Sequence, residues 1–188
     1  MDAASLQKTP LPYERFIDHV IEHCRKDDPR DLRRRDKGFA ARLRRADNPA
    51  TEYQSWELLA SFKIDLTNEN MRLPFVTVAA AIARARVERN GDLSLGRAIA
   101  ACYPEGCESE PAKMRLRRLL ACDDVGELCR LLRPLLKLIA SRVKQPLDYL
   151  RLLRQLRGFT FDAERIKAQW AQDFYRQPVA SDSEEEQA

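Results

Sequence analysis

The chain has 188 residues, of which 44% are hydrophobic and 33% charged, with a net charge of +4. This composition supplies enough apolar material for a core and excludes a chain that is disordered throughout. The longest uncharged apolar stretch, Leu73 to Ala83, is shorter than the roughly 20 residues of a membrane span, so a transmembrane protein is excluded as well. The first residues show no secretion-signal pattern, and we expect a cytoplasmic protein.

Hydrophobic residues recur at intervals of three and four along the chain, and no segment shows the alternation of a half-buried strand. The pattern predicts an all-α protein with about eight to ten helices. The first helix is expected from about Pro12 to Lys26. The second begins near Asp36, a suitable cap, and ends before Pro49.

Two further helices are predicted before residue 90. Thr51 and Gln54 fit a capping box, which predicts that a helix opens there. Pro74 suits the first position of the next helix, because its missing N–H group needs no partner in the first turn. Gly91 lies just past the expected end of that helix.

In the second half, a helix-start residue precedes each apolar stripe. The predicted starts are Ser94, Pro111, Asp123 or Asp124, Pro146 and Asp162. Pro134 predicts a kink or a break near Leu132, since proline removes a backbone donor and clashes one turn back. Gly158 marks the expected end of the helix that Pro146 opens.

The segment that begins at Asn90 is the expected hinge between two sets of helices. We therefore expect two small helical bundles, over residues 1–90 and 91–177. Residues 178–188 are small, polar and acidic, which predicts a disordered tail.

No combination of residues indicates catalysis. The sequence lacks a glycine-rich nucleotide loop and the motifs of zinc proteases and serine hydrolases. His19 and His23 share a helix face but do not complete a metal site. Five cysteines without a secretion signal are expected to be reduced thiols, with Cys122 and Cys129 as small core residues. We expect no enzymatic activity, no metal and no cofactor.

Basic clusters are the most informative feature of the sequence. Without the last eleven residues, the chain has 33 basic and 25 acidic side chains. Between Arg25 and Arg45 there are ten basic residues and four acidic ones, and further basic stripes occupy residues 113–118 and 151–157. A solvated helix surface often has this pattern, but three stripes with few acids favour a track for phosphates. Because no aromatic residues are interleaved, contacts with the backbone are expected rather than base stacking.

Four segments share their order and spacing with a known family. Residues 94–100 (SLGRAIA) are similar to a family signature S-L-G-R-A-[LI]-A, and residues 41–46 (ARLRRA) to A-x-L-R-R-[AG]. Residues 115–124 (RLRRLLACDD), with the leucines that follow them, and residues 170–175 (WAQDFY) are similar to two further segments. Through these segments the chain resembles the CasB family, the small subunits of the type I-E CRISPR Cascade surveillance complex.

The resemblance implies a two-lobed helical subunit without catalytic activity. In the family, two copies lie head to tail in a crRNA-guided complex, and their basic faces hold nucleic acid when target DNA is unwound. The implied partners are therefore crRNA, the target DNA strands, other Cascade subunits and a second copy of the chain. The alternative is a structural helical adaptor whose basic faces contact acidic protein surfaces.

The basic residues expected to bind nucleic acid come from these clusters and segments. They are Arg34, Arg35, Arg42, Arg44, Arg45, Arg97, Lys113, Arg115, Arg117 and Arg118. For Arg97 an alternative remains open, a buried structural arginine that pairs with a carboxylate. No role is assigned to the segment from Arg30 to Lys37 or to the acidic tail.

Overall fold

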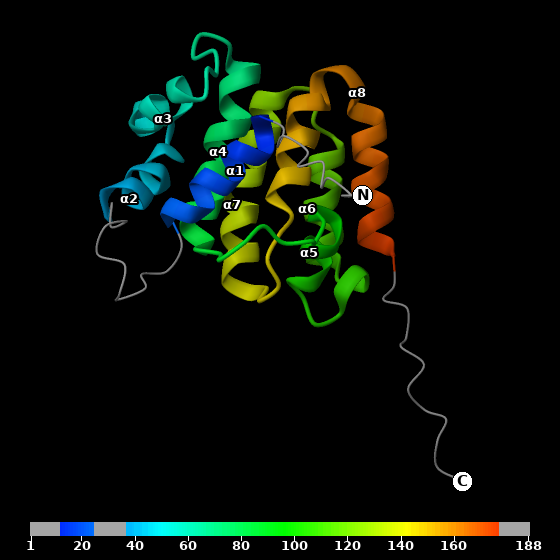
Figure 1. The fold of residues 1–188 in the computed structure, drawn as a ribbon. Coiled ribbons are helices and arrows are strands. Elements are labelled where there is room, and N and C mark those ends of the chain that lie inside the picture. The colour runs from blue at the N-terminus through cyan, green and yellow to red at the C-terminus, as the bar shows by residue number, and fades with distance from the viewer. Residues whose placement is uncertain (1–11, 25–36, 177–188) are drawn as a thin grey trace, which may run out of the picture.

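The computed structural model describes residues 12–24 and 37–176, and helices make up most of these residues (Figure 1). The helices are α1 (Pro12–Cys24), α2 (Lys37–Ala46), η1 (Pro49–Ser55), α3 (Trp56–Ser61), α4 (Glu69–Ala85), α5 (Leu95–Ala101), η2 (Gly106–Glu108), α6 (Glu110–Leu120), α7 (Val125–Arg142) and α8 (Tyr149–Tyr175), where η marks a 3-10 helix. The only β-type pairing in these ranges is an isolated bridge between Leu93 and Leu147. The predicted all-α class is confirmed.

Helix α4 forms the centre of the molecule. Every residue from Pro74 to Ala83 is buried, and α4 packs against α1, α2, α7 and α8. A helix that is buried all round has no polar face. The small side chains of Ala79 to Ala81 let neighbouring helices approach it closely.

The start of α4 differs from the prediction. The helix begins at Glu69, where the Asn68 side chain caps it, so Pro74 lies in its interior and not at its first position. Pro74 has no N–H group to donate to the Asn70 carbonyl one turn back. The Arg157 guanidinium of α8 donates to that carbonyl at 2.7 Å and so replaces the missing donor.

The predicted capping box at Thr51 and Gln54 is wrong. Asn48 caps a 3-10 helix there, with its Oδ1 accepting from the Ala50 N–H at 3.0 Å. The Thr51 hydroxyl donates to the Arg45 carbonyl at 2.6 Å instead of capping a helix. A favourable local pairing with the end of α2 thus replaces the capping geometry.

Three of the predicted second-half starts are confirmed, whereas the helix expected to open at Pro146 begins at Tyr149, where the Asp148 side chain caps it. Ser94 occupies the N-cap position of α5, Pro111 lies in the first turn of α6, and Asp124 caps α7 by accepting from the Glu127 N–H at 2.8 Å. The predicted break near Leu132 is wrong, because α7 continues through Pro134 to Arg142.

Helix α8 is a hairpin of two helical arms. The first arm does not end at Gly158 as predicted but continues to Asp162, the one residue of α8 with non-helical backbone angles. Asp162 is also the residue at which the last helix was expected to begin. The two arms run side by side in Figure 1. They are joined by hydrogen bonds from Trp170 Nε1 to Gln155 Oε1 at 2.8 Å and from Gln155 Nε2 to Gln169 Oε1 at 3.1 Å.

The predicted boundary near Asn90 falls in the connection between α4 and α5. The Asn90 Oδ1 accepts from the Tyr149 N–H at 2.8 Å, and its Nδ2 donates to Asp148 Oδ1 at 2.9 Å, so the connection is bonded to the start of α8. One hydrophobic core extends across both sides of it. The division into two lobes stays a prediction.

The described cysteine thiols are free, and Cys122 and Cys129 are buried as predicted. In the part of the chain that the structure describes, no helix has both the length and the apolar composition of a membrane span. The predicted disordered tail, residues 178–188, lies outside the described residues.

Candidate nucleic-acid interface

The predicted binding residues on α2 differ in what they contact. Arg45 is exposed, whereas the part-buried Arg44 donates from Nη1 to the Ala83 carbonyl at 3.2 Å. That carbonyl is one of the last four of α4, which lack a partner within the helix. Arg44 therefore helps to cap the C-terminus of α4, while Arg45 faces solvent. Arg42 is half-buried beside them, and Arg34 and Arg35 lie outside the described residues.

Arg97 projects from α5 into solvent. Its neighbours Gly96 and Ala98 are buried, and Arg97 itself is exposed. Because Arg97 is exposed, the alternative of a buried arginine that pairs with a carboxylate is wrong.

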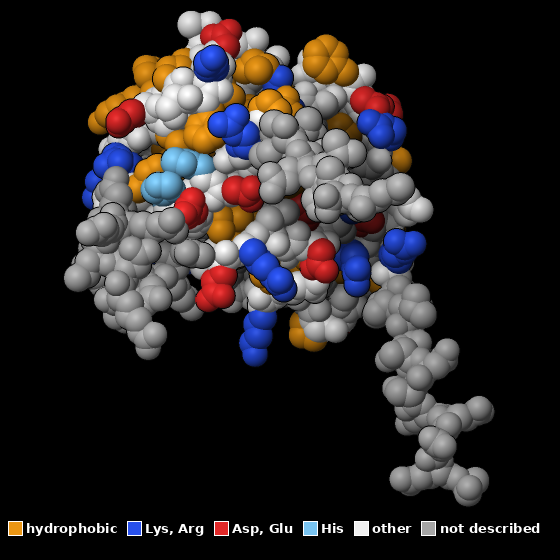
Figure 2. Space-filling view, viewed as in Figure 1, with side chains coloured by type: hydrophobic (Ala, Val, Ile, Leu, Met, Phe, Trp, Pro, Cys, Tyr) orange, Lys and Arg blue, Asp and Glu red, His pale blue; other side chains and the backbone are white. Residues whose placement is uncertain are grey.

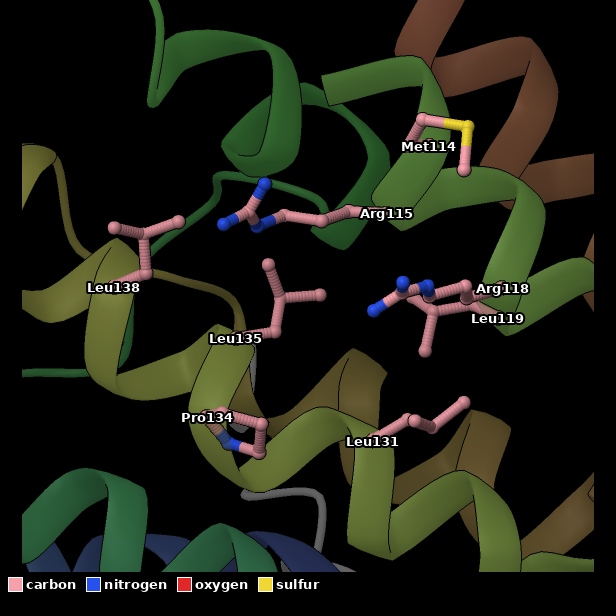
Figure 3. Close-up of a pocket in the computed structure, with 8 residues that line it drawn as sticks. All are labelled: Met114, Arg115, Arg118, Leu119, Leu131, Pro134, Leu135 and Leu138. Carbon is pink, nitrogen blue, oxygen red and sulfur yellow. The ribbon is translucent and has the colours of Figure 1, made fainter. Parts of the chain in front are cut away.

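The four predicted residues on α6 form two pairs with different surroundings. Lys113 Nζ lies 3.1 Å from Glu108 Oε2, and this hydrogen bond raises the pKa of the Lys113 ammonium. Arg117 Nη1 lies 3.9 Å from Glu110 Oε2. Arg115 and Arg118 instead point toward α7 (Figure 3). Acidic neighbours thus compensate Lys113 and Arg117, and Arg115 and Arg118 are left for an anionic partner.

A groove between α6 and α7 receives Arg115 and Arg118. Its cavity volume is about 480 Å³. Figure 3 shows its lining, which consists of Met114, Arg115, Arg118, Leu119, Leu131, Pro134, Leu135 and Leu138. Arg115 is held in place, because its guanidinium carbon lies 5.5 Å from the centre of the Tyr103 ring and its Nη1 donates to the Pro111 carbonyl at 3.1 Å.

Helix α7 adds basic residues that the sequence analysis did not single out. Arg130 is exposed, whereas Arg133 Nε and Lys137 Nζ lie 3.6 Å and 3.1 Å from the carboxylate oxygens of Asp47, which directly follows α2. These three residues follow one another at intervals of three and four, a spacing that would have revealed a basic stripe beside the leucine stripe.

Asp47, which directly follows α2, pairs with Arg133 and Lys137 of α7, and α7 also packs against α6. Helix α7 therefore links the end of α2 to α6, as the ribbon in Figure 1 shows. The candidate interface consists of basic residues on these helices that have no acidic partner in the described residues, namely Arg45, Arg130, Arg115 and Arg118, and we call it the α2–α7–α6 surface.

The three arginines of the stripe at residues 151–157 are bonded to other parts of the protein. Arg151 pairs with Asp173 at 2.7 Å, Arg154 pairs with Glu14 at 2.8 Å, and Arg157 donates to the Asn70 carbonyl as described above. Figure 2 shows one face of the molecule, on which basic and acidic side chains are interspersed. That face has no extended basic area in its described part.

The two histidines lie together on α1. Their rings are 4.1 Å apart, and His23 Nδ1 is 2.8 Å from the His19 carbonyl oxygen. Burial lowers the pKa of the His19 imidazole. Among the described residues, no three His, Cys, Asp or Glu side chains are grouped so that they would hold a metal ion.

Comparisons with known proteins identify a related family and related folds. The model of a family described as CRISPR-associated protein Cse2 matches residues 40–175. The solved structure of CasB from M. ruber is similar, with 23% identity, coverage of 88% of this chain and 93% of that chain, and a TM-score of 0.63.

Two further solved structures have the same fold. CasB from Thermobifida fusca has 21% identity, coverage of 88% and 99%, and a TM-score of 0.65. A CRISPR-associated protein of the Cse2 family from Thermus thermophilus has 24% identity, coverage of 87% and 97%, and a TM-score of 0.56. No curated protein shows significant similarity to the sequence.

Proposed function

Because the chain belongs to the Cse2 family of CRISPR-associated proteins, we propose that it is a non-catalytic small subunit of a type I-E Cascade, the crRNA-guided complex that surveys DNA. In this role it binds the nucleic-acid backbone without reading sequence, and it stabilises the unwound target. Its proposed partners are crRNA, the target DNA strands, the other Cascade subunits and a second copy of itself, in the cytoplasm.

The observation that carries the proposal is the contrast between two kinds of arginine. Arg44, Arg151 and Arg154 bond to groups of the protein. Arg45 and Arg118 are exposed, and neither has an acidic partner within residues 12–24 and 37–176. Free guanidinium groups bind phosphate strongly and without base preference. A guided complex reads sequence by base pairing, so such a subunit needs only charge and shape.

Binding of the full chain to labelled single-stranded DNA at several salt concentrations tests the proposal. Affinity should fall steeply with salt, with a log–log slope of about −0.7 per neutralised phosphate. The variants Arg45→Ala and Arg118→Ala should weaken binding to all sequences alike. Each should reduce the magnitude of the salt slope by about 0.7, the share of one phosphate contact.

The matched control removes an arginine elsewhere. Arg165 is exposed near the kink of α8, where it pairs with Asp162, and Arg165→Ala should leave the salt slope unchanged. Binding that varies with sequence but not with salt, or an equal loss in all three variants, would contradict phosphate binding by the α2–α7–α6 surface.

The stabilisation of unwound DNA is tested in the assembled complex. Arg115→Ala combined with Arg118→Ala should shorten the lifetime of the R-loop more than it weakens crRNA binding. The reason is that a protein shifts an equilibrium only by binding one state better than the other. An unchanged lifetime at normal subunit stoichiometry, also in Arg45→Ala, would favour the structural adaptor that contacts acidic protein surfaces.

A further inference from the structure

The groove between α6 and α7 combines an apolar floor with two arginines on one wall (Figure 3). From this combination we infer that the chain binds single-stranded nucleic acid through a base as well as through phosphates, with an unstacked base lying on the groove floor. The inference rests on the proposed function and adds a contact with a base to it. A purely electrostatic surface would bind a nucleotide and an abasic nucleotide equally well.

One face of α7 forms most of the floor. Leu131, Pro134, Leu135 and Leu138 have the spacing of residues on a single helix face. Leu135 is buried and Leu131 and Leu138 are half-buried, while Met114 of α6 is 46% exposed at the rim. Apolar surface that remains in contact with water is stabilised when a ligand covers it.

The wall of α6 supplies positive charge directly above this floor. Figure 3 shows the guanidinium groups of Arg115 and Arg118 extending from α6 toward Leu135. Arg115 uses one N–H in its bond to the Pro111 carbonyl and lies against Tyr103. A guanidinium has five N–H donors, so Arg115 keeps donors for a phosphate. Arg118 has no acidic partner in the described part of α6 and its neighbours.

A nucleotide has the same two chemistries side by side, a ring with apolar faces and an anionic phosphate. The groove volume of about 480 Å³ lies within the roughly 300–1,000 Å³ of small-molecule sites. In a duplex the faces of the bases are covered by stacking, whereas a single strand can turn a base toward the protein. The exposed Arg130 adds positive charge beyond the groove on α7, which suits a strand of phosphates better than a short acidic peptide.

The test compares two labelled oligonucleotides with the same length and number of phosphates, one made of thymidine nucleotides and one of abasic nucleotides. The full chain should bind the base-bearing strand about fivefold to tenfold more tightly, as expected from burial of one base face. In Met114→Ser and in Leu138→Ser the ratio of the two affinities should fall toward one, while the affinity for the abasic strand and the salt slope stay unchanged.

The matched control is Phe161→Ser. Phe161 is 87% exposed near the kink of α8, so its loss removes an exposed apolar side chain from a different part of the molecule and should keep the preference. Equal affinity of the unchanged chain for both strands, or a preference that survives in Met114→Ser and Leu138→Ser, would overturn the inference and point to a protein segment as the occupant. Failure to bind either strand would instead overturn the proposed function itself.

Discussion

Asp47 is a buried carboxylate with three basic neighbours. Its oxygens lie 3.2 Å from Arg84 Nη2, 3.6 Å from Arg133 Nε and 3.1 Å from Lys137 Nζ. Asp47→Ala leaves the partly buried guanidinium groups without their counter-charge. We therefore expect the free energy of unfolding, measured by urea denaturation, to fall by about 3–5 kcal/mol.

The control for Asp47 is an exposed ion pair. Glu108 pairs with Lys113 at 3.1 Å but is largely exposed. Water screens such a pair, and Glu108→Ala should cost no more than about 1 kcal/mol. Similar losses in Asp47→Ala and Glu108→Ala would show that the buried cluster has no special role in stability.

Buried thiols make stability sensitive to alkaline pH. Burial raises the pKa of the Cys129 thiol from 9.0 to about 11 and that of Cys24 to about 12. Above pH 9 these thiols ionise in the unfolded chain but not yet in the folded one, which favours the unfolded state. Their contribution to the free energy of unfolding is therefore complete below pH 9 and is lost as pH rises toward the folded-state pKa values. The free energy of unfolding should fall by up to about 1.4 kcal/mol per pH unit for each thiol in this window.

Urea denaturation in steps from neutral pH to above the ordinary thiol pKa measures this loss. Cys129→Ala removes one of the ionising groups, so its stability should decline less steeply than that of the unchanged chain. Parallel curves for the two proteins would contradict the assignment of this pH dependence to Cys129.

Helix α5 and the second arm of α8 meet at Gly96. A Cβ atom there would lie 2.2 Å from the Trp170 carbonyl oxygen and 2.7 Å from the Phe174 backbone nitrogen. Both obstacles are backbone atoms, so a side chain would have to push the helices apart. Gly96→Ala should destabilise the protein by about 1–3 kcal/mol in urea denaturation, although alanine favours the helix itself.

The same substitution at Gly158 serves as the control. A Cβ atom at Gly158 would meet only the Ile166 side chain, at the ordinary contact distance of 3.5 Å. Gly158→Ala should therefore stabilise the first arm of α8 by about 0.5–1 kcal/mol. Stabilisation at both positions would show that helix propensity, and not the close approach at Gly96, decides the outcome.

The whole molecule is expected to unfold in one step. Helix α4, which precedes the predicted boundary near Asn90, packs against α7 and α8, which follow it. Shared packing couples the two sides, so thermal unfolding followed by circular dichroism and by calorimetry should show one coincident transition. Two separate transitions would support the predicted division into lobes over residues 1–90 and 91–177.

Helical class and most helix positions could be predicted from the sequence, because apolar spacing and capping are local. Asp124 caps α7 from within its own first turn, and such contacts need no distant partner. The error at Pro74 arose because a distant group intervened. Pro74 lies inside α4 because Arg157, from α8, bonds to the carbonyl that Pro74 leaves unpaired.

The role of each arginine depended on the packing of the chain. Arg154 is paired because the fold brings it to Glu14, 140 residues away, and Arg97 is exposed because its neighbours on α5 turn inward. A basic stripe in the sequence indicates only that charge is present. Whether a guanidinium stays available for phosphate depends on the acids that tertiary contacts place beside it, since a neighbouring carboxylate neutralises its charge and occupies some of its donors.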